Sequence, residues 1–257
     1  MHAQPPPTEG HPEPVTADPP DLTRRSVMSQ AWTDLAYFHW RYDAADVQAL
    51  LPDGVRVDTH DGAAWVGLIP FVMRRVKPLH LGPLPWLSTF VEINVRTYVI
   101  DPEGRRAVWF FSLDVPRRPI VGIARTLFSL PYCSAATTHD VDGEHRRYTL
   151  RRRWPAPKGA HADLAFTIGD PIEPDDETPL DHFLCARWAL LTSTRSGALR
   201  YGRVHHERWP LHQVADHRIA QSVVEASGLA SPVGEVHARY SPGVNVNVSW
   251  LETVAAR

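Results

Sequence analysis

The chain has 257 residues, and its 27 lysine and arginine residues nearly balance its 29 aspartate and glutamate residues, which gives a formal net charge of −2 at pH 7. This balance offers no argument for nucleic acid or an anionic membrane as a partner. Two cysteines, Cys133 and Cys185, are too few and too far apart for a disulfide framework or a zinc site, and no apolar run approaches the roughly 20 residues that span a bilayer. A reduced cytoplasm is the simplest compartment, since the amino-terminal residues also lack the basic and apolar regions of a secretory signal.

The first 28 residues have the composition of a disordered tail. Proline, threonine and acidic residues predominate there, with three consecutive prolines at positions 5–7. Such a segment cannot bury enough apolar surface to offset the entropy that it would lose on ordering. We therefore predict a disordered tail over residues 1–28 and a single folded domain over residues 29–257.

Strand-like patterns dominate the rest of the chain, with turn residues such as Asp61-Gly62 between them. Strands are predicted over residues 31–41, 55–58, 63–73, 90–100, 107–115, 133–138, 146–152, 165–168, 236–240 and 244–250. Helices are predicted after the N-cap Asp43 and over residues 120–128, 179–188 and 216–226, the last of them ended by Gly228. Many short strands with a few isolated helices predict an α+β fold that is mainly antiparallel β, in the form of a closed or nearly closed barrel.

The segment 90–99 (FVEINVRTYV) is the most informative of these strands. Its alternation places β-branched residues on one face and hydrogen-bonding side chains on the other, namely Glu92, Asn94, Arg96 and Tyr98. The polar face could meet water, as one face of an antiparallel sheet often does, or it could line a pocket, and the pattern alone leaves both readings open. Since Glu92 and Arg96 are about 13 Å apart at their Cα atoms, they are placed to bracket a small ligand rather than to neutralise each other.

Three histidines are secondary candidates for chemistry. His39 lies among aromatic residues, a setting more typical of a core residue than of a catalyst. His205 and His206 are adjacent, so on a strand they point to opposite faces and cannot both bind one metal ion. We therefore predict no metal site. One of the pair would point into a pocket as an acid or base, and we assign that role to His205.

The charge runs and the nucleophile motifs carry less information. The basic runs at 146–147 and 151–153 are balanced by an acidic segment at 170–177. Neither the aromatic residues nor a motif of a nucleic-acid site accompanies them. Solvated faces that pair within the fold or across a dimer explain both runs, so a homo-oligomer remains compatible with the sequence. No Gly-x-Ser-x-Gly element is present, and neither cysteine has motif-level neighbours.

Four segments together resemble the YqjF-like bacterial family of unknown function, which is similar in fold to acetoacetate decarboxylase. They are residues 39–71 (HWRYDAADVQALLPDGVRVDTHDGAAWVGLIPF), 90–99 (FVEINVRTYV), 110–132 (FFSLDVPRRPIVGIARTLFSLPY) and 204–211 (VHHERWPL). The resemblance covers roughly residues 30–250. It implies a cone-shaped β-barrel with a closed internal pocket, and therefore an inward-facing polar row at Glu92.

The resemblance does not carry the decarboxylase chemistry with it. Acetoacetate decarboxylase has a Gly-Arg-Glu element followed by Pro-Lys-Lys, in which the first lysine forms a Schiff base and the second lowers its pKa. Here the corresponding elements read Ala124-Arg125-Thr126 and Pro131-Tyr132-Cys133. The only lysines of the chain, Lys77 and Lys158, are remote from that motif, whereas the glutamate of the pocket strand does match, at Glu92. Without an amine nucleophile no iminium can form.

We therefore predict an enzyme that acts on a carbonyl or carboxylate compound inside the barrel by acid/base chemistry, without metal or organic cofactor. The predicted catalytic residues are Glu92 and Tyr132, with His39 and His205 as secondary candidates, and the predicted substrate-binding residues are Asn94, Arg96, Tyr98 and Arg125. A first alternative is a ligand-binding protein that kept the pocket and lost catalysis. A second is a structural or interaction protein that uses an exposed sheet face or the proline-rich tail.

Overall fold

The computed structural model describes residues 12–20, 26–78, 89–117, 121–122, 125–126 and 128–255. Its strands are β1 (Ser26–Tyr42), β2 (Arg56–Val57), β3 (Ala64–Pro78), β4 (Phe90–Ile100), β5 (Arg106–Val115), β6 (Tyr132–Asp142), β7 (His145–Trp154), β8 (His161–Pro171), β9 (Ala189–Ser193), β10 (Leu199–His206), β11 (His212–Gln221), β12 (His237–Ser249) and β13 (Glu252–Thr253). The helical elements are α1 (Ala44–Gln48), α3 (Pro179–Cys185) and the 3-10 turns η1 (Pro174–Asp176) and η2 (Glu225–Ser227). No helix among the described residues is long and apolar enough to cross a membrane.

The strands close into a barrel. In the described part of the chain, nine of them follow one another in the order β5-β6-β7-β8-β11-β12-β1-β3-β4, and β4 pairs with β5 to complete the ring. All of these pairings are antiparallel except that of β5 with β6. Closure leaves no free edge in the ring, which is how a large antiparallel sheet satisfies its outermost backbone groups.

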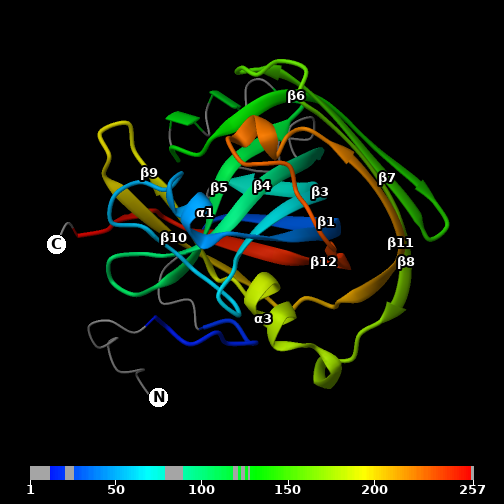
Figure 1. The fold of residues 1–257 in the computed structure, drawn as a ribbon, viewed down its shortest axis with the longest axis horizontal. Coiled ribbons are helices and arrows are strands. Elements are labelled where there is room, and N and C mark those ends of the chain that lie inside the picture. Colours follow the sequence, from blue (N-terminus) through cyan, green and yellow to red (C-terminus); the bar gives the residue numbers. More distant parts are fainter. Residues whose placement is uncertain are drawn as a thin grey trace.

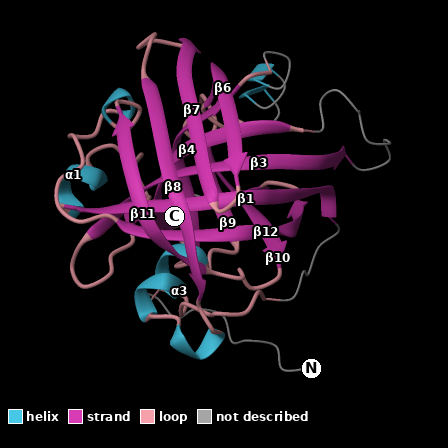
Figure 2. Ribbon diagram, turned by 90° about the vertical axis from the view of Figure 1, so that its right-hand side faces the viewer, coloured by secondary structure: helices cyan, strands magenta, loops and turns pink. Residues whose placement is uncertain are grey.

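β9 and β10 enclose a second, smaller compartment beside the nine-stranded ring. β9 pairs with β5, and β10 pairs with both β9 and β12. These two strands therefore close a second ring together with β12, β1, β3, β4 and β5, which belong to both rings and are the shared strands. Figure 1 shows β6, β7, β8 and β11 as a curved wall on the right, β1, β3, β4 and β12 through the middle, and β9 and β10 on the left. In Figure 2 the curved wall crosses the shared strands at a steep angle. The shared strands thus have two buried faces.

β1 illustrates why a shared strand is apolar on both of its faces. Ala36, Phe38 and Trp40 belong to the core beneath the curved wall, whereas Leu35 and Tyr37 belong to the core on the side of β9 and β10. Because successive side chains of a strand point to opposite faces, a strand buried on both sides must be apolar at nearly every position.

β1 also bends between the two compartments. Asp34 has a φ of +51°, and the pairing of β1 with β3 is irregular between Thr33 and Phe38. The Asp34 carboxylate accepts hydrogen bonds from Arg146 (3.2 Å) and Tyr240 (3.1 Å), which hold this left-handed residue in place. Such an irregularity increases the local twist and helps a sheet to curve into a barrel.

The predicted fold class is confirmed, with corrections to single elements. The helix predicted over residues 216–226 is wrong, because most of that segment forms β11, which pairs with β8. Only the short turn η2 follows, ended by Gly228 in the left-handed region at φ +93°. β9 and β10 were not predicted, and the two strands predicted at 236–240 and 244–250 form one continuous strand, β12. Of the helix predicted over 120–128, residues 121–122 and 125–126 are helical, and residues 120, 123, 124 and 127 lie outside the described residues.

Part of the predicted tail differs from the expectation. Residues 1–11 and 21–25 lie outside the described residues, but residues 12–20 contact the barrel. The backbone of Glu13 bonds to that of Gly104 (2.9 Å), and the indole of Trp188 donates to the carbonyl of Thr16 (3.1 Å). These bonds attach residues 12–20 to the folded domain, which the composition of the segment did not predict.

Candidate functional site

The main cavity lies in the smaller compartment, between the shared strands on one side and β9 and β10 on the other. Its volume is about 440 Å³, and residues from β1, β3, β4, β5, β9, β10 and β12 line it. Most of the lining is aliphatic or aromatic. A largely apolar cavity with a few converging polar groups is the usual form of a small-molecule site.

The polar row of β4 faces this cavity. Glu92, Asn94 and Arg96 line it and are each less than 10% exposed. Ile93 and Val95, between them in sequence, belong to the core on the opposite face of the sheet. Tyr98 continues the row but is fully buried and lies behind Arg96 rather than at the cavity wall. The alternation of the sequence thus places the hydrogen-bonding face toward the cavity rather than toward water.

Glu92 has an environment suited to proton transfer near neutral pH. Its carboxyl group accepts hydrogen bonds from the Asn94 amide (3.4 Å) and the Tyr132 hydroxyl (3.2 Å). Burial raises the pKa of Glu92 to about 7; the bonds from Asn94 and Tyr132 lower it, and the nearby Asp114 raises it. Loss of hydration penalises the charged carboxylate more than these two donors compensate. At pH 7 the residue can therefore both accept and release a proton.

Arg96 is held from behind the cavity wall. One of its terminal nitrogens donates to the hydroxyl of Tyr98 (3.2 Å) and to the carbonyl of Leu184 (3.3 Å). Tyr98 in turn donates to the same carbonyl (2.8 Å). The Nε of Arg96 is buried and has no hydrogen-bond partner. The guanidinium is therefore fixed in position while part of its donor capacity remains unused.

His39 supports this arrangement and does not reach the cavity. Its Nε2 lies 2.6 Å from the Tyr98 hydroxyl. Since that hydroxyl donates its proton to Leu184, Nε2 must carry the proton of the histidine, which leaves Nδ1 bare. Burial, and then the charge of Arg96, hold the pKa of His39 well below its usual value. His39 is thus a neutral donor that positions Tyr98.

Arg187 is a cavity residue that the sequence analysis missed. It is buried, it lines the cavity next to Cys185, and its Nε donates to the carbonyl of Phe183 (2.7 Å). One terminal nitrogen pairs with Asp58 (2.8 Å), and the other is buried without a partner. Arg187 follows the end of α3 in an irregular segment, where no periodic pattern indicates which way a side chain points.

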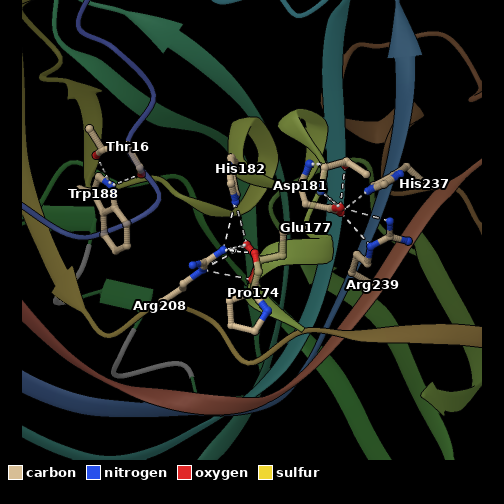
Figure 3. A network of polar contacts seen from close by, with 10 residues as sticks. Thr16, Pro174, Glu177, Asp181, His182, Trp188, Arg208, His237 and Arg239 are labelled. Carbon is tan, nitrogen blue, oxygen red and sulfur yellow. Dashed lines mark hydrogen bonds and ion pairs between the residues drawn. The ribbon is translucent and has the colours of Figure 1, made fainter. Parts of the chain in front are cut away.

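Helix α3 carries the Leu184 carbonyl, and a polar network fixes the helix. Thr178 and Asp181 form a reciprocal capping box at its start. Asp181 also pairs with His237 and Arg239 of β12, each at 2.8 Å (Figure 3). Although burial acts in the opposite direction, the hydrogen bonds from His237, Thr178 and Arg239 hold the pKa of Asp181 well below its usual range. The helix is thus tied to the shared strands by an ionised carboxylate.

A second set of contacts in Figure 3 ties the segment before α3 to the loop after β10. Glu177 pairs with Arg208 (3.0 Å) and His182 (3.0 Å). These pairs lie outside the cavity lining, so their role is to hold the elements that surround it.

The structure corrects the choice between the two adjacent histidines. His205 is half-buried, does not line the cavity, and lies 3.3 Å from the carbonyl of Pro20. His206 lines the cavity, and its Nδ1 donates to the carbonyl of Glu207 (2.6 Å), so its Nε2 is the atom available to a ligand. Burial lowers the pKa of His206 to about 4. The two positions alternate as predicted, but the strand parity places the second residue inward.

Arg125 and Tyr132 were both predicted at the site, and only Tyr132 lines the cavity. Arg125 donates to the backbone carbonyl of Tyr132 (2.8 Å) and lies over the ring of Trp154 (4.9 Å). It therefore supports Tyr132 from outside. The buried pair of Asp114 on β5 with Arg152 on β7, at 2.6 and 2.8 Å, spans the intervening strand β6.

The described cavity lining contains neither a metal-binding cluster nor a lysine amine. Within the described residues no group of three His, Cys, Asp or Glu side chains is arranged to hold a metal ion. Lys77 and Lys158 are exposed, and neither lines the cavity. The position that a Schiff-base lysine would occupy by resemblance carries the Tyr132 hydroxyl.

Comparisons with known proteins agree with the resemblance read from the sequence. Residues 29–245 match the family model DUF2071, described as an uncharacterized conserved protein. The chain is also 31% identical over 215 residues to the uncharacterized protein YqjF of Bacillus subtilis (strain 168), an alignment that covers 84% of this chain and 87% of YqjF.

Solved structures confirm the predicted fold. The enduracididine biosynthesis enzyme MppR, complexed with pyruvate, superposes with a TM-score of 0.62 at 13% identity, covering 90% of this chain and 91% of MppR. An acetoacetate decarboxylase-like enzyme from Sphingomonas wittichii RW1 gives a TM-score of 0.62 at 15% identity, covering 90% and 94% of the two chains. At these identities the likeness concerns the fold alone.

Proposed function

The chain belongs to the DUF2071 family, and from the geometry of its cavity we propose that it is an enzyme that moves a proton at the carbon next to a carbonyl group in a small carboxylate compound. The observation that carries the proposal is the buried Glu92 carboxyl at the cavity wall, hydrogen-bonded to Tyr132 and Asn94, with a pKa of about 7. A perturbed titratable group in a cavity, beside donors that can stabilise an oxyanion, is the usual composition of such a site.

In the proposed reaction the ionised Glu92 takes a proton from the carbon beside the carbonyl. The electron pair of the broken C–H bond moves into the new C=C bond, and the carbonyl becomes an enolate oxygen. As Glu92 becomes protonated, the Tyr132 hydroxyl and the Asn94 amide turn their hydrogen bonds from its carboxylate to that oxygen, and Arg96 holds the carboxylate of the substrate. Return of the proton from Glu92 to carbon completes an exchange or an isomerisation, and no other reagent is required.

A Schiff base is not part of this proposal. Both lysines of the chain are exposed and away from the described cavity lining, so the electron sink must be the carbonyl oxygen itself. Carbon acids of this kind are weakly acidic, which makes oxyanion stabilisation the larger part of the catalytic task. The structural neighbour MppR is complexed with pyruvate, and this supports an oxo acid as the class of compound to test.

Proton exchange can be measured without knowledge of the natural substrate. Wild-type protein is incubated in D₂O with a panel of 2-oxo and 3-oxo carboxylates, and loss of the α-proton signal is followed by ¹H NMR. We expect faster exchange than in buffer for at least one member, and a loss of about 100-fold or more in the Glu92→Gln variant, since general-base catalysis contributes about 10²–10⁴-fold. Glu173→Gln, at an exposed glutamate remote from the cavity lining, is the matched control.

A ligand-binding protein without catalysis is the second candidate. The observation that favours it is the same replacement of the lysine pair by Tyr132 and Cys133. It predicts that the protein binds a member of the panel while the α-protons exchange no faster than in buffer. That outcome would reject the enzymatic assignment of Glu92.

A further inference from the structure

Two guanidinium groups, those of Arg96 and Arg187, line the end of the cavity where Cys185 of α3 also lies. The Cζ atoms of Arg96 and Arg187 lie 5.5 and 4.8 Å from the centre of the same ring, that of Tyr98. Arg187 shares its carboxylate partner, Asp58, with Arg106. The positive charges at this end therefore exceed the negative ones that pair with them.

Arg96 has no ion pair with any carboxylate among the described residues. Its partners are a carbonyl and a hydroxyl, and its Nε remains unused. The free terminal nitrogen of Arg187 is likewise buried without a partner. A buried cation is costly unless an anion pairs with it, and the N–H edge of a guanidinium matches the two oxygens of a carboxylate. Both features indicate an anionic group of the ligand at this end.

The opposite end of the cavity is apolar. Along β4 the polar row ends at Phe90, which pairs with Met73 of β3. Val76, Met28, Val248 and Trp250 continue the lining there, and Trp250 is 64% exposed, so this end reaches the protein surface. Because side chains on one face of a strand are about 7 Å apart, the path from Arg96 past Glu92 to Phe90 is about 20 Å at the backbone.

The volume exceeds what a four-carbon acid would fill. About 440 Å³ lies within the range of roughly 300–1,000 Å³ that encloses drug-sized ligands. A short acid would fill only the part of the cavity between the arginines and Glu92, and it would leave the aromatic walls without contacts. A ligand with an apolar body would bury that body against them.

We propose that the ligand of this cavity is a monocarboxylate with an extended aliphatic or aromatic body, its carboxylate held between Arg96 and Arg187 and its body directed along Phe90 and Met73. The inference rests on the proposed function for the site and goes beyond it in naming the substrate class. It assigns Arg187 as a second carboxylate-binding residue and the apolar end as the determinant of chain length.

The test is a binding series on the wild-type protein by isothermal titration calorimetry, with straight-chain carboxylates from butanoate to decanoate and with octanamide as the uncharged match of octanoate. Affinity should rise about three- to fourfold for each added methylene up to octanoate, since burial of a methylene contributes about 0.8 kcal/mol. Octanamide should bind at least tenfold more weakly than octanoate. Equal affinities along the series, or equal affinities of octanoate and octanamide, would overturn the proposal.

Variants separate the two ends of the cavity. Met73→Trp, which fills the apolar end, should weaken octanoate at least tenfold and leave butanoate within twofold. Arg96→Gln should weaken both acids at least tenfold, with the exposed Arg147→Gln as its control. If Arg96→Gln does not fold, the wild-type series and Met73→Trp still decide the question. A Met73→Trp variant that binds octanoate as wild type does would contradict the proposed placement of the body.

The binding series is independent of the proposed chemistry. Glu92→Gln should retain the dependence on chain length while it loses proton exchange. Chain-length dependence without exchange in the wild type would reject the enzymatic function and keep the ligand class. Proton exchange without chain-length dependence would reject the ligand class and keep the enzymatic function.

Discussion

Tyr132 donates a 3.2 Å hydrogen bond to Glu92 although the two residues lie on β6 and β4, which are separated in the sheet by β5. The bond crosses the wall of the cavity at the place where β5 and β6 pair in parallel, with Leu113 opposite Tyr132. It therefore depends on closure of the barrel rather than on either strand alone. Through this bond the ionisation of Glu92 is coupled to the position of the Tyr132 segment.

Tyr132→Phe should raise the pKa of Glu92 above its value of about 7. The hydroxyl bonds to the carboxyl and lowers its pKa, and a hydrogen bond to a charged group contributes about 1.5–3 kcal/mol, or about one to two pKa units. The shift can be followed by ¹³C NMR of the glutamate side chains. An unchanged or lower pKa in this variant would mean that Tyr132 does not stabilise the carboxylate.

Glu92→Gln should make the protein more stable at pH 8 and leave its stability at pH 5 within about 1 kcal/mol of the wild type. The folded-state pKa of about 7 lies above the ordinary value of 4.5, so the folded chain binds the proton more tightly than the unfolded chain does. That stabilisation is complete below about pH 4.5 and is lost as the pH rises through 7. The difference of about 2.5 pKa units corresponds to about 3 kcal/mol at pH 8. Urea unfolding of both proteins at the two pH values measures it, and a variant less stable than wild type at pH 8 would refute the prediction.

His206 should act on stability in the opposite sense. Its folded-state pKa of about 4 lies below the ordinary value of 6.5, so the unfolded chain binds the proton first as the pH falls. The stability associated with the neutral imidazole is complete above about pH 6.5 and is lost between 6.5 and 4. His206→Gln should therefore reduce the loss of unfolding free energy between pH 7 and pH 4 by about 2–3 kcal/mol. The variant also loses the contacts of His206 with Trp188 and Trp209. The change of unfolding free energy with pH is therefore compared between the two proteins, rather than its absolute value.

Gly67→Ala should disturb the support of Arg96. A Cβ at Gly67 would lie 2.6 Å from Nε2 of His39, the atom that bonds to Tyr98. We expect a loss of about 1–3 kcal/mol in unfolding free energy, as for other overpacked core sites. In the His39→Ala background the same substitution should cost much less, because the clashing atom is gone. Gly122→Ala, where a Cβ meets nothing within 4 Å, is the control. Equal costs of Gly67→Ala in both backgrounds would contradict the clash.

The site could be read from the sequence where it lies on a strand with strict alternation. The row at Glu92 was identifiable because its opposite face is entirely β-branched or apolar, so only one face could carry hydrogen-bonding groups. The adjacent histidines show the limit of the same rule. Alternation separates His205 from His206 but does not state which of them points inward, since that depends on the register of β10 against β9 and β12.

Two features had no local signal. Arg187 lies in an irregular segment after α3, and its position at the cavity results from bonds to Phe183 and Asp58, both outside its own segment. The segment that forms β11 carries alanines and cap-like residues typical of a helix, yet it pairs with β8 along most of its length. Closure of the barrel requires a strand there, and this tertiary demand overrides the local preference.

The most direct measurement is the pKa of Glu92 itself, from a ¹³C NMR titration of the glutamate carboxyl carbons with the Glu92 signal assigned by its absence in Glu92→Gln. The proposed site predicts a midpoint near 7 in the free protein, well above the ordinary value of 4.5. A midpoint near 4.5 in the free protein would contradict it, because a carboxyl with the acidity of one in water is not the sheltered acid/base on which the proposed chemistry depends.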